Sequence, residues 1–400
     1  MGYSPQVNLS GRDAFMTQAY AHPFTRTDRS PTAIWWWTLD RVTLTLALIL
    51  LVLGFFFSFS SSPVAAPHVS NYDTFYYTKR HFFFAILTAG VMIAISMLSL
   101  KGVKRVSLLA YGAAITIMAM LPLIGHAAKG GRRWLELGPI ALQPSEFLKP
   151  ALIVLIAWMF SEGQKGKGVP GVTVAFCLYA LAIGLLLIQP DVGQSILITI
   201  AFGACFFISG VPFRWILGML GVAVTGLVGL FFIQPHFRTR IMGFIAPDAD
   251  SGFQVAKAKA AIANGGLWGV GLNEGVMKRH IPDLHTDFIY SVVAEEYGLW
   301  LTLILIGIFG FIILRGLLKA MAMQDPFRQI ATSGLYIMLG MQVLINVSVN
   351  LGLIPPKGMT LPFISYGGSS MLAMGLTLGF ILALTRKRQE EIPQDDPTKW

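Results

Sequence analysis

Charge is scarce in this 400-residue sequence, and its scarcity excludes most soluble folds. Charged side chains make up only 12% of the residues, whereas 54% are hydrophobic and the mean hydropathy is +0.64. A soluble chain of this length would form two or three domains with charged surfaces, which this composition does not supply. Apolar runs recur instead at lengths that suit a bilayer, roughly 17–25 residues each. The composition therefore predicts a polytopic membrane protein with little soluble mass.

Cysteine, internal repeats and the common catalytic motifs are also missing or nearly so. The only two cysteines, Cys177 and Cys205, lie in apolar runs, which favours packing over a disulfide. There is no nucleotide-binding loop, no HExxH and no GxSxG. The first 30 residues lack the layout of a cleavable signal peptide, so we expect a cytoplasmic N-terminus. The missing repeat weakens an inverted-repeat transporter as the explanation.

Ten apolar segments follow a polar tail. They cover residues 42–60, 82–100, 106–124, 144–161, 169–189, 192–212, 215–235, 288–314, 329–353 and 368–385. We therefore predict an all-α polytopic membrane protein with ten transmembrane helices and both termini in the cytoplasm. The expected parts are a cytoplasmic tail (1–40), a ten-helix membrane domain (41–386) and a second cytoplasmic tail (387–400). One long extracytoplasmic loop (236–287) joins helices seven and eight.

Basic residues outnumber acidic ones and give a net charge of +10. In a membrane protein this favours lipid headgroups or anionic lipid-linked substrates, not nucleic acid. With the N-terminus inside, 17 of the 30 basic residues face the cytoplasm, a weak bias under the positive-inside rule. Most of the others gather around residues 129–149 and in the loop 236–287, whose middle (253–263) predicts a short surface helix. Positive charge on the outer face indicates an external anion.

The stretch from Lys278 to Gly298 concentrates ionisable groups at one membrane boundary. Thr286 or Asp287 stands just before an apolar run, where a side-chain oxygen would cap the helix. The Asp287 carboxylate is also placed to act as a general base, and both roles are compatible. Glu295 lies deeper in the helix, and we expect it to form a structural ion pair rather than to catalyse. Four side chains here could hold a divalent cation (Mg²⁺ or Mn²⁺), although their spacing matches no metal motif: His280, Asp283, His285 and Asp287.

A second constellation occupies residues 126–150. A Gly-Gly turn beside three cations predicts a loop that could wrap a phosphate group: Lys129, Arg132 and Arg133. Pro144 is typical of a first helical position, and Glu146 and Lys149 are spaced to pair on one face of that helix. A capped membrane helix beside a basic loop would explain the same residues, and spacing alone does not decide.

Two shorter motifs lie elsewhere. Gln189-Pro190-Asp191 predicts a tight outer turn in which Asp191 caps the next helix. The stretch PFISYGGSS (362–370) is too polar and too rich in glycine for simple spanning. It predicts non-helical backbone that lines a cavity.

Together these motifs resemble the SEDS family (shape, elongation, division and sporulation) of bacterial cell-wall proteins. The resemblance rests on GGRRW, LQPSEFLKP, IQPDVGQS, the GGLWGVGL…IPDLHTDFIYSVVAEEYG stretch and PFISYGGSS, in order between about 41 and 386. The polar tail of 40 residues favours the division type of this family over the elongation type. The resemblance implies a ten-helix peptidoglycan glycosyltransferase that polymerises lipid II beside a class B penicillin-binding protein.

The resemblance also assigns roles to residues. The carboxylate of the HTDF motif, thought essential in the family, falls on Asp287, and Arg133 falls on a position implicated in substrate handling. Ile281-Pro282-Asp283 stands where family members often have Leu-Pro-Glu. We expect substrate contacts from ten side chains: Lys129, Arg132, Arg133, Trp134, Glu146, Lys149, Lys278, His285, Ser365 and Ser369.

The chemistry so implied is an inverting glycosyl transfer. Asp287 takes the proton from the 4-hydroxyl of the acceptor GlcNAc, and that oxygen attacks C1 of the donor MurNAc and displaces undecaprenyl pyrophosphate. Cations, with or without a divalent metal, stabilise the leaving group. The site would face outward from the bacterial inner membrane at the division septum, among other divisome membrane proteins. Two alternatives stay open: a lipid II flippase, and a non-catalytic scaffold for the transpeptidase.

Overall fold

The computed structural model describes residues 30–66, 73–124, 126–128, 131–138, 140–166, 168–211, 213–245 and 250–387. Lys129, both tails beyond these limits and the segment 246–249 lie outside the described residues. Two compact units divide the chain, one of residues 41–385 and one of residues 1–40 with 386–400. In the smaller unit, helix α2 (Pro31–Thr38) begins where the Ser30 hydroxyl accepts a bond from the Ala33 amide.

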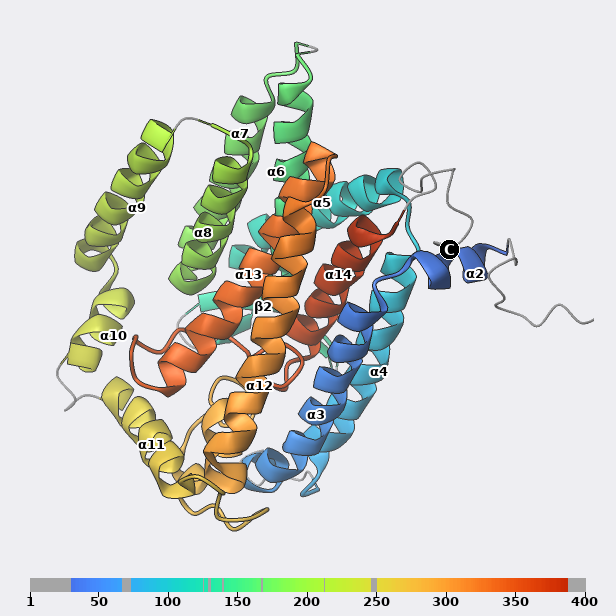
Figure 1. Cartoon of the computed structure of the whole chain (residues 1–400). Coiled ribbons are helices and arrows are strands. Elements are labelled where there is room, and N and C mark those ends of the chain that lie inside the picture. The colour runs from blue at the N-terminus through green and yellow to red at the C-terminus, as the bar shows by residue number, and fades with distance from the viewer. Residues whose placement is uncertain are drawn as a thin grey trace, which may run out of the picture. The chain divides into compact units, whose positions relative to one another are not determined.

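The larger unit is a bundle of long helices (Figure 1). The long helices are α3 (Arg41–Ala65), α4 (Tyr76–Ser96), α5 (Leu100–Ile124), α6 (Pro144–Gln164), α7 (Gly171–Ile188), α8 (Val192–Ile208), α9 (Phe213–Ile233), α12 (Ile289–Met321), α13 (Pro326–Asn350) and α14 (Gly368–Thr385). The shorter ones are α10 (Pro235–Ile245), α11 (Asp250–Gly265) and the 3-10 turn η2 (Met277–His280). The expected short helix in the long loop is therefore confirmed as α11.

Eight of these helices are long and apolar enough to cross a membrane: α3, α4, α5, α6, α7, α12, α13 and α14. Helices α8 and α9 occupy the other two predicted segments: α8 has only 17 residues, and within the 21 residues of α9 the fully described part gives an apolar stretch of Val224–Ile233. A mostly helical membrane fold is thus confirmed. The count of ten spans and the sidedness of the termini remain predictions.

The helices at the centre of the bundle are less apolar than several at its edge. Helix α6 has a mean hydropathy of 1.3 with 83% of its span buried, and α13 has 1.6 with 78% buried. Helix α7 has 2.5 with only 22% buried. Lipid tails solvate apolar side chains as well as a protein core does, so polar side chains collect where helices face each other. Helix α13 packs on α6, α8, α12 and α14, and it carries much of the polar interior.

Local sequence signals explain several helix starts. Pro144 occupies the first turn of α6 as predicted, and the Asp191 carboxylate accepts a bond from the Gln194 amide at the start of α8 (3.4 Å), also as predicted. Helix α13 begins with Pro326 after Asp325, whose carboxylate accepts a bond from the Phe327 amide (2.9 Å).

A small antiparallel sheet corrects the all-α prediction. Strands β1 (His126–Ala128), β2 (Gly131–Leu137) and β3 (Ile140–Leu142) lie in the order β1-β2-β3 between α5 and α6. Arg132 and Arg133, which were expected in a phosphate-wrapping loop, lie on strand β2. Gly138 has a φ of 63° directly after β2, a left-handed conformation that suits a tight turn into β3.

Helix α12 is interrupted at Gly298, where φ is 79° and ψ is −177°. The glycine-rich segment after α11 lies against this break: Val270 N donates to Glu295 O (3.0 Å) and Leu299 N donates to Gly266 O (3.0 Å). A Cβ on Gly298 would lie 2.4 Å from the Gly269 nitrogen, so only glycine permits this approach. The segment 266–288 is thereby attached to the helix that it precedes.

Candidate active site

Asp287 lies just before helix α12, with its backbone held on both sides. Its amide donates to Asp283 O (3.1 Å), and its carbonyl oxygen accepts from Nδ2 of Asn346 and of Asn350 (3.0 Å each). The N-cap position of α12 is Phe288, which makes no side-chain cap. The N-cap thus lies one residue after Asp287 and two after Thr286, the two predicted capping positions, and the Asp287 carbonyl bonds to α13 instead of joining the helix ladder. The Asp287 side chain is half-buried.

The segment 351–367 forms the wall opposite Asp287. It is non-helical, which confirms the prediction for residues 362–367 of PFISYGGSS, whereas the last three residues form the start of helix α14 at Gly368. A Cβ placed on Gly358, whose φ is 65°, would lie 3.6 Å from Asp287 Oδ2. The Ser365 hydroxyl accepts a bond from the Leu361 amide (2.7 Å). Ser365 is buried within its own turn and Ser369 within the first turn of α14, so both support this wall from inside.

An aromatic cluster surrounds His285, two residues before Asp287. The His285 ring lies 4.2 Å from the Tyr77 ring of α4 and 5.8 Å from the Tyr366 ring, between centroids. The Tyr366 amide donates to His285 O (2.9 Å). Burial raises the pKa of the Tyr366 hydroxyl to about 12, so it stays protonated at neutral pH. These contacts join α4 and the segment 351–367 to the loop that carries Asp287.

A buried polar chain crosses the bundle behind the segment 351–367. Lys149 Nζ lies 2.8 Å from Glu146 Oε2 and donates to Gln342 Oε1 (3.3 Å). Gln194 donates to Glu146 Oε1 (2.7 Å), and Gln342 donates to Thr360 O (3.1 Å). The predicted pairing of Glu146 with Lys149 is confirmed. Lys149 is 0% exposed, so the structure favours an internal role for the pair over the substrate contact that we expected.

Strand β2 places its basic side chains against helix ends. Arg133 donates to Gln189 O (2.8 Å) and Pro190 O (2.7 Å), and it lies 3.9 Å from Asp191. Burial raises the pKa of Asp191, and the neighbouring guanidinium partly offsets that rise. Arg132 is exposed and donates to Pro122 O (2.6 Å). Trp134, half-buried, pairs with His126 across the β1–β2 ladder.

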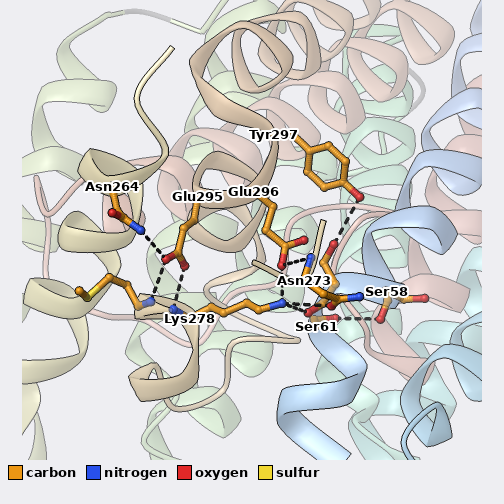
Figure 2. Close-up of polar contacts among 10 residues, drawn as sticks. Ser58, Ser61, Asn264, Asn273, Lys278, Glu295, Glu296 and Tyr297 are labelled. Atoms are coloured by element: carbon orange, nitrogen blue, oxygen red, sulfur yellow. Dashed lines mark hydrogen bonds and ion pairs between the residues drawn. The ribbon is translucent and has the colours of Figure 1, made fainter. Parts of the chain in front are cut away.

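Lys278 was expected to face substrate, and the structure places it in the protein interior instead. Its ammonium bonds to Glu296, to Ser60 O (2.7 Å) and to Asn273 Oδ1 (3.3 Å), and it is 1% exposed (Figure 2). Glu295 accepts from Asn264 Nδ2 (3.0 Å) and from the amides of Met277 and Lys278 (2.8 Å each).

These contacts change two expectations. Glu295 has the structural role that we expected, but backbone amides satisfy its carboxylate, and the ion pair belongs to Glu296. Lys278 joins α3, η2 and α12 at this point, so it is removed from the proposed substrate contacts. The reason is that the loop 266–288 folds back on α12 and carries Lys278 inward.

No three His, Cys, Asp or Glu side chains converge on a metal site within the described ranges. The sequence interpretation also missed Gln342, Asn346 and Asn350, three polar side chains of α13 on the side of the helix that faces the site. Their spacing of four residues inside an apolar span was the available signal, because amides are costly in a membrane unless they have partners.

The site thus lies in a multi-pass membrane bundle, with a half-buried carboxylate beside a non-helical segment. The sequence profile of the FtsW/RodA/SpoVE family, described as cell cycle protein, matches residues 40–390. The chain belongs to this family.

Individual relatives and structures agree with the assignment. The chain is 56% identical over 373 residues to "Probable peptidoglycan glycosyltransferase FtsW" of Caulobacter vibrioides, covering 93% of this chain and 96% of that protein. A chain from a peptidoglycan synthase complex that coordinates polymerization and crosslinking superposes with a TM-score of 0.72 at 28% identity, covering 88% of this chain and 98% of that one. RodA of Thermus thermophilus superposes with a TM-score of 0.64 at 26% identity, covering 88% and 97%.

Proposed function

We propose that this chain is a division-type peptidoglycan glycosyltransferase that polymerises lipid II into β-1,4-linked glycan strands. The names of its relatives support the reaction class, and their similarity extends over nearly the whole chain. The observation that carries the proposal within the site is Asp287. It is a half-buried carboxylate, next to a non-helical wall, on a backbone that is fixed from both sides.

Asp287 acts as the general base. It accepts the proton of the acceptor GlcNAc 4-hydroxyl while that oxygen forms a bond to C1 of the donor MurNAc. The bond from C1 to the pyrophosphate breaks, and the lipid pyrophosphate leaves with the electron pair. The configuration at C1 is inverted. Gly358 has no side chain, so the space beside the carboxylate stays open. A Cβ at this position would occupy it and lie 3.6 Å from Oδ2.

The leaving pyrophosphate needs cations rather than an acid. Arg132 is the exposed basic residue of strand β2, and Arg133 is half-buried at the α7–α8 turn. A guanidinium presents five donors in a planar fork, so bonds to backbone carbonyls leave donors for phosphate oxygens. We propose Arg132 as the main phosphate contact, with Lys129 and Arg133 beside it. His285 and Trp134 line the sugar side, and the buried Ser365 and Ser369 support the neighbouring wall from inside.

The proposed placement follows from the reaction. The ten long helices all span the inner membrane, with both termini in the cytoplasm and with Asp287 and the loop 236–287 on the outer face. Lipid-linked donors reach such a site from the outer leaflet. The partners are lipid II, the growing glycan strand, a class B penicillin-binding protein that cross-links it, and other divisome membrane proteins at the septum. A resident Mg²⁺ or Mn²⁺ is not part of the proposal.

Glycan polymerisation from purified lipid II tests the function. Wild type and Asp287→Asn are compared in detergent, each with the partner transpeptidase, and products are separated by length on a gel. We expect polymer from wild type and a rate lower by at least about 10²-fold from the variant, a typical loss when a general base is removed. Glu274→Gln removes an exposed carboxylate from the same loop and should leave polymerisation unchanged.

The alternative functions give different results. Equal polymer from wild type and Asp287→Asn would move the active site elsewhere. No polymer from folded wild type, together with transfer of lipid II across vesicles that contain the protein, would favour the flippase. The absence of both activities, with transpeptidase binding retained, would favour the scaffold.

A further inference from the structure

We infer that Asn346 and Asn350 of helix α13 are positioning residues that hold the backbone of Asp287 and set the direction of its carboxylate. The inference rests on the proposed function. It adds two residues that touch no reacting atom and act only through the base.

The two amides occupy one carbonyl oxygen. Nδ2 of Asn346 and Nδ2 of Asn350 each lie 3.0 Å from Asp287 O, and the two residues are one helical turn apart. A carbonyl oxygen has two lone pairs, so this clamp uses its full accepting capacity. The Asp287 amide is bonded to Asp283 O (3.1 Å), so neither backbone polar group of Asp287 is left to rearrange.

The clamp also takes the place of a helical hydrogen bond. In a regular helix the Ser291 amide would donate to Asp287 O, four residues earlier. Here it donates to Phe288 O (3.1 Å) and to Asn350 Oδ1 (3.2 Å), and the Ser291 hydroxyl donates to the same Asn350 oxygen (2.7 Å). Asn350 therefore bonds to both groups that a regular helix would join directly, the Asp287 carbonyl and the Ser291 amide. These bonds keep Asp287 outside the helix.

The chemistry of the neighbours fixes both amide orientations. Asn346 Nδ2 faces two carbonyl oxygens, Asp287 O and Met359 O (2.6 Å), so only the donor end fits there. Asn350 Oδ1 faces two donors from Ser291, so its Nδ2 must point to Asp287.

One asparagine thus bonds to both walls of the site. Asn346 links Asp287 O to Met359 O, the residue after Gly358, and Gly358 is the residue that faces the Asp287 carboxylate. Both asparagines are buried, at 1% and 0% exposed. Buried amides in an apolar span cost stability unless each finds partners, so their bonds to this one carbonyl explain why they are tolerated here.

Steady-state kinetics of the purified protein with its partner transpeptidase test the inference. The variants are Asn346→Ala and Asn350→Ala, and Thr332→Val is the control. Thr332 is a buried hydroxyl of the same helix with no hydrogen-bond partner among the described residues. We expect kcat to fall on the order of 10²-fold for Asn346→Ala and about 10-fold for Asn350→Ala, with the KM for lipid II within about twofold. A role in general packing would not separate kcat from KM.

Hydrogen exchange gives a reading that does not depend on activity. The Ser291 amide should lose part of its protection in Asn350→Ala relative to Thr332→Val, because one of its two acceptors is gone and only Phe288 O remains. If Asn350→Ala fails to fold, Asn350→Asp keeps the shape and replaces the donor with an oxygen, and we expect the same fall in kcat.

Two results would overturn the clamp: wild-type kcat in folded variants, or unchanged protection at Ser291. Failure of the proposed function is distinct from either, since wild type itself would then make no polymer while hydrogen exchange still reports on the clamp.

Discussion

The carboxylate of Asp287 and the pair Glu295 and Glu296 lie within ten residues of each other at the start of α12, and their surroundings differ. Asp287 is half-buried, and its known bonds to α13 are made by its backbone. Glu295 and Glu296 are 0% and 2% exposed, and their oxygens receive backbone amides, an asparagine and an ammonium (Figure 2). A cluster of charged residues in the sequence therefore does not identify an active site by itself. A fully buried carboxylate that bonds to an ammonium or to backbone amides stabilises the fold, whereas a half-buried one at the edge of the bundle is the better candidate for a substrate contact.

The largest effect should come from breaking the buried ion pair. Lys278→Met leaves the Glu296 carboxylate buried without its cation, and we expect a loss of about 3–5 kcal/mol in the free energy of unfolding. Adding Glu296→Gln should restore much of this loss, because no uncompensated charge then remains. Thermal unfolding in detergent measures both variants.

A matched surface pair provides the control for Lys278. Lys79 and Asp73 form an exposed ion pair, so Lys79→Met should not change the melting temperature measurably. Equal stability of Lys278→Met and wild type would show that the cluster around Glu296 is not structural, and the contrast with Asp287 would fail.

An intermediate effect should come from filling the space beside the base. Gly358→Ala places a methyl group against Asp287 Oδ2, and we expect polymerisation to fall about 10-fold because a small misplacement of the reacting groups is costly. The φ of 65° adds roughly 1 kcal/mol of strain. Activity should therefore fall much more than stability, which is the reverse of Lys278→Met.

Gly138→Ala separates the strain from the crowding. Gly138 has a φ of 63°, and a Cβ there would meet nothing within 4 Å. This variant should have a similar melting temperature to Gly358→Ala but near wild-type polymerisation. Equal activity of the two variants would show that the space beside Asp287 does not matter.

The smallest effect should come from Asp191, which is buried like Glu295 and Glu296 but lies at the start of a helix like Asp287. Asn is as good an N-cap as Asp, so Asp191→Asn should change stability at neutral pH by less than about 1 kcal/mol. Burial raises the pKa of Asp191, so its ionisation opposes folding, and the stability present below the unfolded pKa is lost as pH rises through the folded pKa. Asp191→Asn has no carboxyl to ionise here, so its free energy of unfolding should rise relative to that of wild type as pH rises from acid to neutral. A constant difference across that range would contradict the prediction.

Much of the fold could be predicted from local sequence, since the long helices coincide with the apolar segments. Helix starts at Pro144 and Asp191 and the non-helical backbone of residues 362–367 followed from residue chemistry alone. The pairing of Glu146 with Lys149 followed from helical spacing. The strand conformation of residues 131–134 did not, because glycine next to arginine suits a phosphate loop and a hairpin equally well.

The sequence by itself determined the class of the protein, its apolar helices, and Asp287 as the carboxylate to examine. Only the tertiary structure decided which charges face inward. Lys278, Glu295 and Glu296 form one buried cluster because the glycine-rich segment folds back on α12 at Gly298, and Asp287 stays outside the helix because two amides of α13 hold its carbonyl. The physical reason is that a polar group in a membrane bundle takes its role from the partners that burial leaves it. Those partners come from helices far apart in the sequence, so spacing along the chain does not reveal them.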